Sequence, residues 1–147
     1  MQAEIIDLGA NLGGCLDPAR AKRVRLFPGT SVAAYARSEH PTPDLIVVSD
    51  VLHHVPPPER RQFFADLRTL VGGKKSTLFV KDLEPGSWKA TVGYLADRYV
   101  SGDKGVSLIG EAALRALLTE TFPGASLRST NLIERDPPNY AVVCDLP

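Results

Sequence analysis

Continuous apolar runs mark the strongest predicted strands of this chain. The segments IIDL, LIVV and LFV carry apolar residues at consecutive positions rather than in alternation. Such runs are typical of strands that are covered on both faces, as in parallel sheets. The predicted strands are Glu4–Leu8, Val24–Phe27, Asp44–Ser49, Ser76–Lys81 and Asn139–Asp145, with Ser126–Leu132 as a weaker sixth.

Segments with helical spacing separate these strands. The clearest helix covers Pro58–Val71, where apolar residues recur at helical intervals and Gly72-Gly73 supplies a C-terminal stop. The other predicted helices are Thr30–Ser38, Trp88–Tyr99 and Glu111–Thr121.

The alternation of strands and helices predicts an α/β fold, with a Rossmann-like, mostly parallel sheet and helices on both faces. The last two strands differ, because only the short segment RDPPN joins them. They should therefore form an antiparallel hairpin, which makes the C-terminal strand antiparallel.

Charge and composition narrow the classes of function. The chain of 147 residues has 17 basic and 17 acidic side chains, so it lacks the basic surface typical of nucleic-acid binding. No apolar run is long enough to cross a membrane, and the N-terminus does not resemble a signal peptide. We expect one cytoplasmic domain over residues 1–147, with no nucleic-acid or membrane partner.

The cysteines and histidines do not predict a metal site. Cys15 and Cys144 are far apart, and Cys144 sits in an apolar run as a small hydrophobic residue. His53 and His54 are adjacent, and neighbouring residues rarely converge on one ion. We expect no bound metal.

Ligands of open α/β sheets bind outside the carboxyl ends of the strands, so the residues after each apolar run are the candidates. The first such segment, Asp7–Gly14, has an acid at a strand end and then a glycine-rich turn that lets backbone approach a ligand. The second, Ser49–Pro56, contains the two histidines, and a histidine can accept a proton near neutral pH. Alternatively, one of these histidines packs under the ligand and shapes the loop. The third, Lys81–Gly86, reads as a rim for a second substrate or as a solvated loop.

The stretch DLIVVSDVLHHVP, a helix, a GG turn and then LFVKDLEPGSWK resemble the second half of class I S-adenosylmethionine (SAM) methyltransferases. The resemblance is specific from Asp44 to Trp88 and extends weakly to the C-terminus. It implies SAM as the methyl donor and a methyl transfer to an acceptor.

Two registers remain open for the N-terminal part. In the first, IIDLGANLGG is the glycine-rich first motif of the family, but Val24–Phe27 then comes early and carries no terminal acid for the ribose. In the second, Asp7 is that ribose-binding acid on the second strand, but the first motif is missing. We favour the first register, and both give Asp7 a role toward SAM.

The resemblance implies a role for each candidate residue, and methyl transfer from SAM depends mainly on aligning donor and acceptor. His53 or His54 would accept a proton. The expected cofactor contacts are Asp7, Gly9, Asn11, Gly13, Ser49, Asp50 and Val51. The expected contacts to a small-molecule acceptor are Lys81, Asp82, Trp88, Tyr94 and Tyr99.

The chain is short for the family, since only five or six of its usual seven strands can be placed. An uncovered strand edge would favour a homodimer or a partner chain that completes the sheet. The alternative function is an inactive methyltransferase-fold protein that serves as a binding or structural partner. A nucleotide-binding oxidoreductase is disfavoured, because GANLGG does not match GxGxxG.

Overall fold

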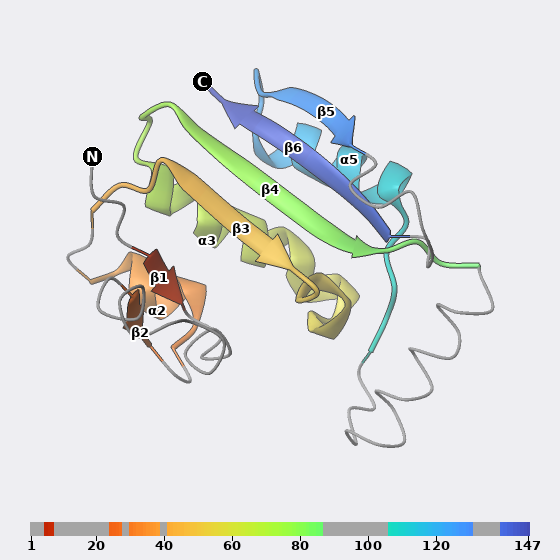
Figure 1. Ribbon diagram of the computed structural model, residues 1–147, viewed down its shortest axis with the longest axis horizontal. Coiled ribbons are helices and arrows are strands. Elements are labelled where there is room, and N and C mark those ends of the chain that lie inside the picture. Colours follow the sequence, from red (N-terminus) through yellow and green to blue (C-terminus); the bar gives the residue numbers. More distant parts are fainter. Residues whose placement is uncertain (1–4, 8–23, 28–29, 39–40, 87–105, 131–138) are drawn as a thin grey trace. The chain divides into compact units, whose positions relative to one another are not determined.

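Two units make up the chain, Met1–His40 and Pro41–Pro147 (Figure 1). The structure is a computed structural model. It describes residues 5–7, 24–27, 30–38, 41–86, 106–130 and 139–147.

The first unit contains two short parallel strands and a short helix. Strand β1 (Ile5–Asp7) pairs with β2 (Val24–Leu26), so both predicted strands are confirmed. Helix α2 (Val32–Ala36) begins where the Ser31 side chain accepts a hydrogen bond from the backbone N–H of Ala34 at 3.1 Å.

The second unit is built on a four-stranded sheet in the order β3-β4-β6-β5 (Figure 1). Strands β3 and β4 are parallel, whereas β6 is antiparallel to both β4 and β5. Three strands therefore run in one direction, and the C-terminal strand lies antiparallel between β4 and β5, as the predicted hairpin requires. The strand bounds are Leu45–Ser49 for β3, Ser76–Leu83 for β4, Ser126–Thr130 for β5 and Asn139–Leu146 for β6.

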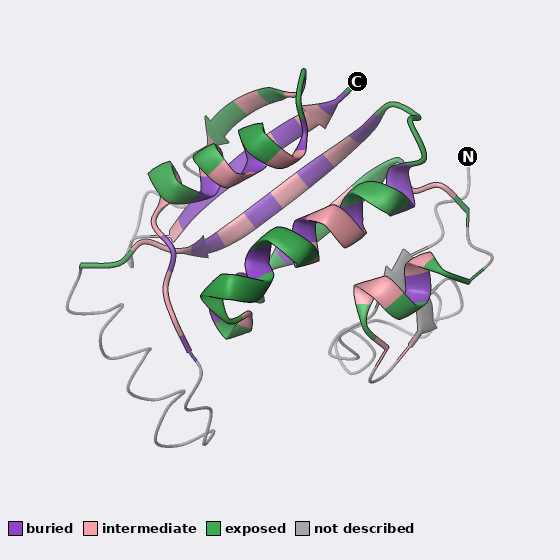
Figure 2. Cartoon of the chain, turned by 180° about the vertical axis from the view of Figure 1, so that it is seen from behind, coloured by how far each residue is buried: buried purple, intermediate pink, exposed green. Residues whose placement is uncertain are grey.

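Helices α3 (Arg60–Val71) and α5 (Glu111–Thr121) pack on the same face of this sheet (Figures 1 and 2). Both confirm predicted helices, and α3 ends at Gly72 with a φ of 57°, the left-handed conformation that favours glycine. The predicted helix Trp88–Tyr99 lies outside the described residues. Together with the sheet order, these elements confirm the Rossmann-like α/β fold class.

The core of the second unit lies between the sheet and its two helices (Figure 2). Burial alternates along β4, because every second side chain faces the helices. The fully buried side chains there include Phe64, Leu78, Val80, Leu114, Leu118 and Val142.

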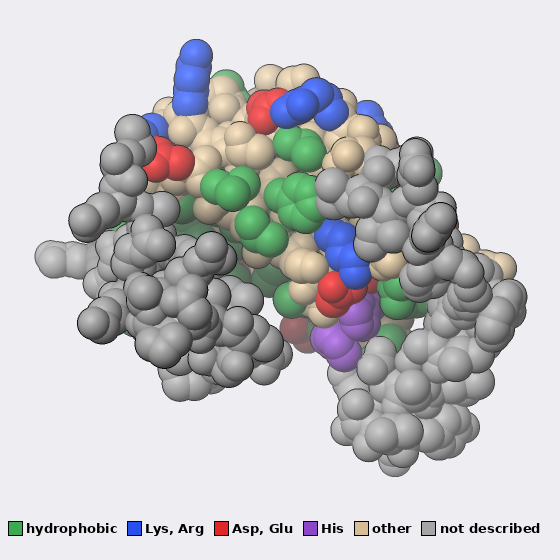
Figure 3. All heavy atoms as spheres, in the orientation of Figure 1, with side chains coloured by type: hydrophobic (Ala, Val, Ile, Leu, Met, Phe, Trp, Pro, Cys, Tyr) green, Lys and Arg blue, Asp and Glu red, His purple; other side chains and the backbone are tan. Residues whose placement is uncertain are grey.

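The opposite face of the sheet is more open than the apolar runs predict. Leu45 and Val47 on β3 are each 58% exposed, and Figure 3 shows hydrophobic side chains gathered over the strands of this face. Within the described part of this unit, no α-helix covers β3 on this face, because α3 and α5 both lie on the other side of the sheet.

Candidate functional site

The carboxyl ends of β3 and β4 bring Ser49, Asp50 and Lys81 together. The Lys81 ammonium lies 2.5 Å from one carboxylate oxygen of Asp50, and the Ser49 hydroxyl donates to the other at 3.0 Å. The backbone N–H of Asp50 also donates to the Lys81 carbonyl oxygen at 3.1 Å. These residues form a polar cluster that is partly open to solvent, since the Asp50 side chain is 47% exposed.

Asp50 turns the chain away from β3. Its φ is 56°, in the left-handed region, which aspartate adopts more readily than most side chains but glycine adopts without strain. The turn leads directly into a 3-10 helix at Leu52–His54. The left-handed backbone of Asp50 therefore sets the direction in which the chain enters the 3-10 helix Leu52–His54.

We expect this backbone conformation to separate two substitutions of Asp50. Asp50→Ala and Asp50→Gly both remove the contacts with Lys81 and Ser49, but only alanine retains a Cβ that opposes a positive φ. Asp50→Ala should therefore lower the free energy of unfolding by about 1 kcal/mol more than Asp50→Gly. Urea denaturation of both variants measures the difference. Equal stability of the two would contradict the assignment of strain to this position.

His53 and Asp82 form a buried pair. His53 Nδ1 lies 2.8 Å from Asp82 Oδ1, and the backbone N–H of His53 donates to Asp82 Oδ2 at 3.1 Å. His53 is 4% exposed and Asp82 is 0% exposed. The backbone N–H of Leu83 donates to Asp82 Oδ1 at 2.8 Å, so three N–H groups converge on one buried carboxylate.

This pair fixes which nitrogen of His53 can take up a proton. A carboxylate only accepts hydrogen bonds, so Nδ1 must carry the hydrogen that it shares with Asp82. The lone pair that can accept a proton is then on Nε2. In catalytic triads, a buried aspartate holds an imidazole in this way and orients the histidine that acts as the base.

The sequence predicted that Asp82 lies on a rim that contacts the acceptor. In the structure its side chain is buried instead. Strand β4 continues two residues past the predicted end at Lys81, and its side chains alternate between the two faces of the sheet. Lys81 therefore meets Asp50 at the open end, whereas Asp82 points into the core toward His53. Its burial makes Asp82 a partner of the candidate base rather than a group that faces solvent.

His54 differs from His53 in its environment. His54 is exposed, and its ring lies 4.1 Å from the His53 ring, measured between centroids, with the planes tilted by 46°. The sequence analysis did not distinguish the two adjacent histidines. In the structure, His53 is buried and oriented by a carboxylate, whereas His54 is exposed beside it.

Arg60 and Tyr140 also belong to this buried cluster, and sequence patterns did not identify them. Arg60, the first residue of α3, is 7% exposed, and its Nε donates to the Val55 carbonyl oxygen at 3.0 Å. Burial lowers the pKa of Arg60, and the Asp82 carboxylate opposes this effect. Burial raises the pKa of Tyr140, which stands opposite Asp82 in the pairing of β6 with β4.

One signal in the sequence could have pointed to Arg60. A cation in the first turn of a helix is unfavourable toward the helix dipole, so it needs another partner. Tyr140 gives no comparable signal, because its position opposite Asp82 depends on strand register.

The remaining predicted site residues lie partly outside the described residues. Asp7 ends β1, where only the backbone is described. Val51 follows Asp50 and is 43% exposed, close to the polar cluster in sequence. Outside the described residues lie Gly9, Asn11, Gly13, Trp88, Tyr94 and Tyr99.

The described residues contain no group of three or more histidine, cysteine or acidic side chains placed to hold a metal ion. Cys144 is fully buried, and burial raises the pKa of its thiol to about 11, so it behaves as a small hydrophobic residue there. None of the helices in the described part of the chain has the length and apolar character needed to span a bilayer.

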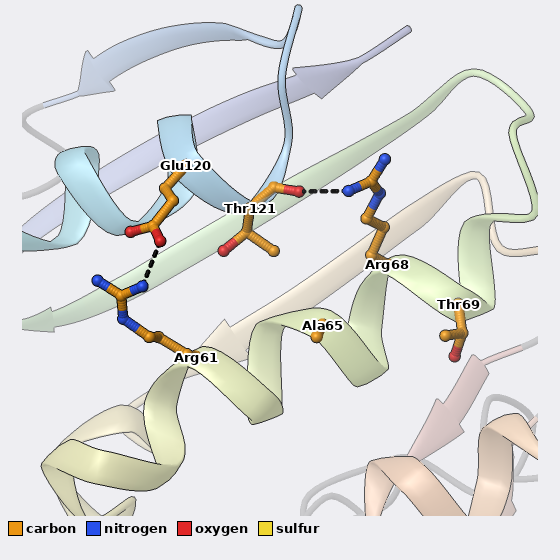
Figure 4. A pocket seen from close by; sticks show the side chains of 6 residues that line it. All are labelled: Arg61, Ala65, Arg68, Thr69, Glu120 and Thr121. Atoms are coloured by element: carbon orange, nitrogen blue, oxygen red, sulfur yellow. Dashed lines mark hydrogen bonds and ion pairs between the residues drawn. The ribbon is translucent and has the colours of Figure 1, made fainter.

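A shallow groove of about 470 Å³ lies between α3 and α5 (Figure 4). Two side chains bridge it: Arg61 pairs with Glu120, and Arg68 donates to the Thr121 carbonyl oxygen at 3.1 Å. It contains none of the predicted site residues, so the candidate site remains the cluster at the strand ends.

Comparison with known sequences gives no family assignment. No protein-family model matches the chain. No curated protein matches it either.

Solved structures show a clear likeness of fold. An O-methyltransferase family protein from Burkholderia thailandensis aligns with a TM-score of 0.66 at 14% identity over 99% of this chain and 44% of its own. A SAM-dependent methyltransferase from Archaeoglobus fulgidus aligns with a TM-score of 0.66 at 12% identity, over 97% of this chain and 85% of its own.

PigF with SAH aligns with a TM-score of 0.65 at 12% identity, over 96% of this chain and 42% of its own. The chain thus spans less than half the length of PigF and of the Burkholderia protein. The resemblance noted in the sequence is confirmed at the level of fold: this chain has the fold of the class I SAM-dependent methyltransferases.

Proposed function

We propose that this chain is a SAM-dependent methyltransferase that acts on a small-molecule acceptor and uses His53 to take up the acceptor's proton. The observation that carries the proposal is the buried His53–Asp82 pair beside the carboxyl ends of β3 and β4. A fold does not by itself give a function, so the proposal depends on this side-chain arrangement within the fold.

The residues present suit the chemistry of SAM. SAM, when bound, supplies an activated methyl group on a sulfonium, together with hydroxyl and amino groups that need hydrogen-bond partners. The carboxylate of Asp50 and the hydroxyl of Ser49 offer such partners, and the exposed Val51 offers an apolar surface. Asp7 ends a strand of the parallel pair β1–β2, where an acid is suited to bind hydroxyl groups.

The role of His53 follows from its geometry. With a hydroxyl acceptor, bound SAM would supply the methyl group and be left as SAH, and His53 Nε2 would take up the hydroxyl proton. Asp82 keeps the imidazole in the tautomer that can accept this proton. Because the Burkholderia protein is named an O-methyltransferase family protein, an oxygen acceptor is the first class to test.

Isothermal titration calorimetry with SAM and S-adenosylhomocysteine (SAH) tests the proposal directly. We expect saturable binding of both ligands to the full chain, because its fold is that of SAM-dependent methyltransferases. Asp7→Ala should abolish the binding heat, whereas Asp44→Ala should retain it, since the Asp44 side chain is exposed and pairs with Lys74 on the surface at 3.1 Å.

The decisive outcome is binding itself. If neither ligand gives heat at millimolar concentration while the protein is folded, the chain is the inactive methyltransferase-fold partner protein instead. If binding is found, release of SAH with a panel of small phenols, amines and thiols identifies the acceptor class. A panel that gives turnover only with amines or thiols would reject the oxygen acceptor but retain methyl transfer.

A further inference from the structure

One segment of the second unit contacts the 3-10 helix Leu52–His54, which we call the histidine turn. The return segment, defined here as Val106–Gly110, leads into α5 and is buried at Val106 and Ile109. The backbone N–H of Ser107 donates to the His53 carbonyl oxygen at 2.8 Å. The return segment therefore touches the backbone of the candidate base itself.

Two side chains hold the return segment from other elements. Arg60 Nη2 donates to the Ser107 carbonyl oxygen, and the Tyr140 hydroxyl donates to the Ile109 carbonyl oxygen at 2.7 Å. At the end of the segment, Glu84 accepts a hydrogen bond from the backbone N–H of Glu111 at 2.8 Å. A Cβ on Gly110 would lie 2.9 Å from a Glu84 carboxylate oxygen, so a side chain at this position would displace that carboxylate.

Arg60 hydrogen-bonds both to the chain just after His53 and to the return segment. Its Nε binds the carbonyl oxygen of Val55, just after the histidine turn, and its Nη2 binds Ser107, whose N–H binds His53. The planar guanidinium offers these two donors in a fixed fork, which a lysine ammonium cannot reproduce.

The burial of Arg60 is difficult to explain by stability alone. Removing a guanidinium from water is costly, and a well-packed apolar side chain is often as stabilising at such a position. Arg60 also begins α3, where the helix dipole disfavours a cation. A role in holding the histidine turn in place would explain why a buried arginine is found here, despite its desolvation and the unfavourable helix dipole.

We propose that Arg60 is a positioning residue that clamps the His53 turn to the return segment and so holds the imidazole against Asp82. This inference rests on the proposed function for its effect on catalysis. Its effect on the His53 ring is independent of that function, and the two are measured separately.

The full-length variants Arg60→Met and Arg60→Lys test the clamp. Methionine retains an apolar stem without donors, and lysine retains the charge without the fork. The matched control is Arg61→Met, because Arg61 is adjacent in sequence but its side chain is 70% exposed and pairs with Glu120.

Nitrogen-15 NMR of the histidine rings gives the first readout, with the His53 signals assigned by their loss in His53→Gln. In the parent protein we expect His53 to hold its hydrogen on Nδ1, and in Arg60→Met we expect averaged shifts from mixed tautomers. Arg60→Lys, which should fold even if Arg60→Met does not, is expected to shift in the same direction by less. Arg61→Met should match the parent spectrum.

SAH release with an active acceptor from the panel gives the second readout. Arg60→Met should lower kcat by about 100-fold and Arg60→Lys by about tenfold, with the dissociation constant for SAM unchanged, because a small misplacement of a base has this effect. Parent-like His53 shifts in folded Arg60→Lys or Arg60→Met would overturn the clamp. Altered shifts in a chain that does not bind SAM would support the clamp and reject the proposed function.

Discussion

Replacing Asp82 with alanine is expected to lower the free energy of unfolding by about 3 kcal/mol. The substitution leaves three N–H groups without their acceptor: His53 Nδ1, the His53 backbone and the Leu83 backbone. A buried donor without a partner costs its full desolvation, and the site is too deep for water to compensate easily, since Asp82 is 0% exposed. Urea denaturation followed by circular dichroism measures the loss.

Asp44→Ala is the matched control for this prediction. Asp44 also adjoins a strand of the same sheet, but its side chain is 84% exposed and its pair with Lys74 is on the surface. Its removal should change the free energy of unfolding by less than about 0.5 kcal/mol. Comparable losses in the two variants would show that Asp82 is not the buried acceptor that the structure places beside His53.

The positions of the strands and helices follow closely from the sequence, because burial against one sheet imposes a regular hydrophobic pattern. Helix α3 shows this, since it ends at the predicted Val71 before Gly72 and begins at Arg60, two residues after the predicted start. Strand β5 was the weakest prediction, because it is an edge strand whose segment SLRST carries few apolar residues.

The candidate site was predictable only in part. The sequence indicated the strand ends that carry Asp50 and His53, because ligands of α/β sheets bind there. It did not distinguish His53 from His54, since their difference comes from Asp82, a residue 29 positions away. A polar residue at a buried strand position also breaks the apolar pattern, which is why the predicted strand ended before Asp82.

The remaining partners of His53 depend on tertiary pairing. Tyr140 reaches the cluster because β6 lies next to β4 with Tyr140 opposite Asp82, a register that no local pattern specifies. Arg60 meets Ser107 across 47 positions of the chain. Local chemistry thus predicts where a site forms, whereas the fold determines which groups orient its central residue.

The adjacent histidines provide the largest expected change in catalysis. His53→Gln should lower kcat by about 10²–10⁴-fold, the usual contribution of a positioned general base, because glutamine cannot accept the proton. His54→Gln should leave kcat within about threefold of the parent, since the exposed His54 does not share the Asp82 carboxylate in the described contacts. Release of SAH under saturating SAM and acceptor measures both values.

Binding of SAM separates a chemical role from a structural one. Calorimetry should give the parent dissociation constant for both variants, because neither histidine belongs to the proposed cofactor contacts Ser49, Asp50 and Val51. A loss of kcat with intact SAM binding in His53→Gln alone would support proton uptake at His53. If His54→Gln shows the greater loss, the exposed ring is the base, and the buried pair of His53 with Asp82 serves to hold the turn that presents it.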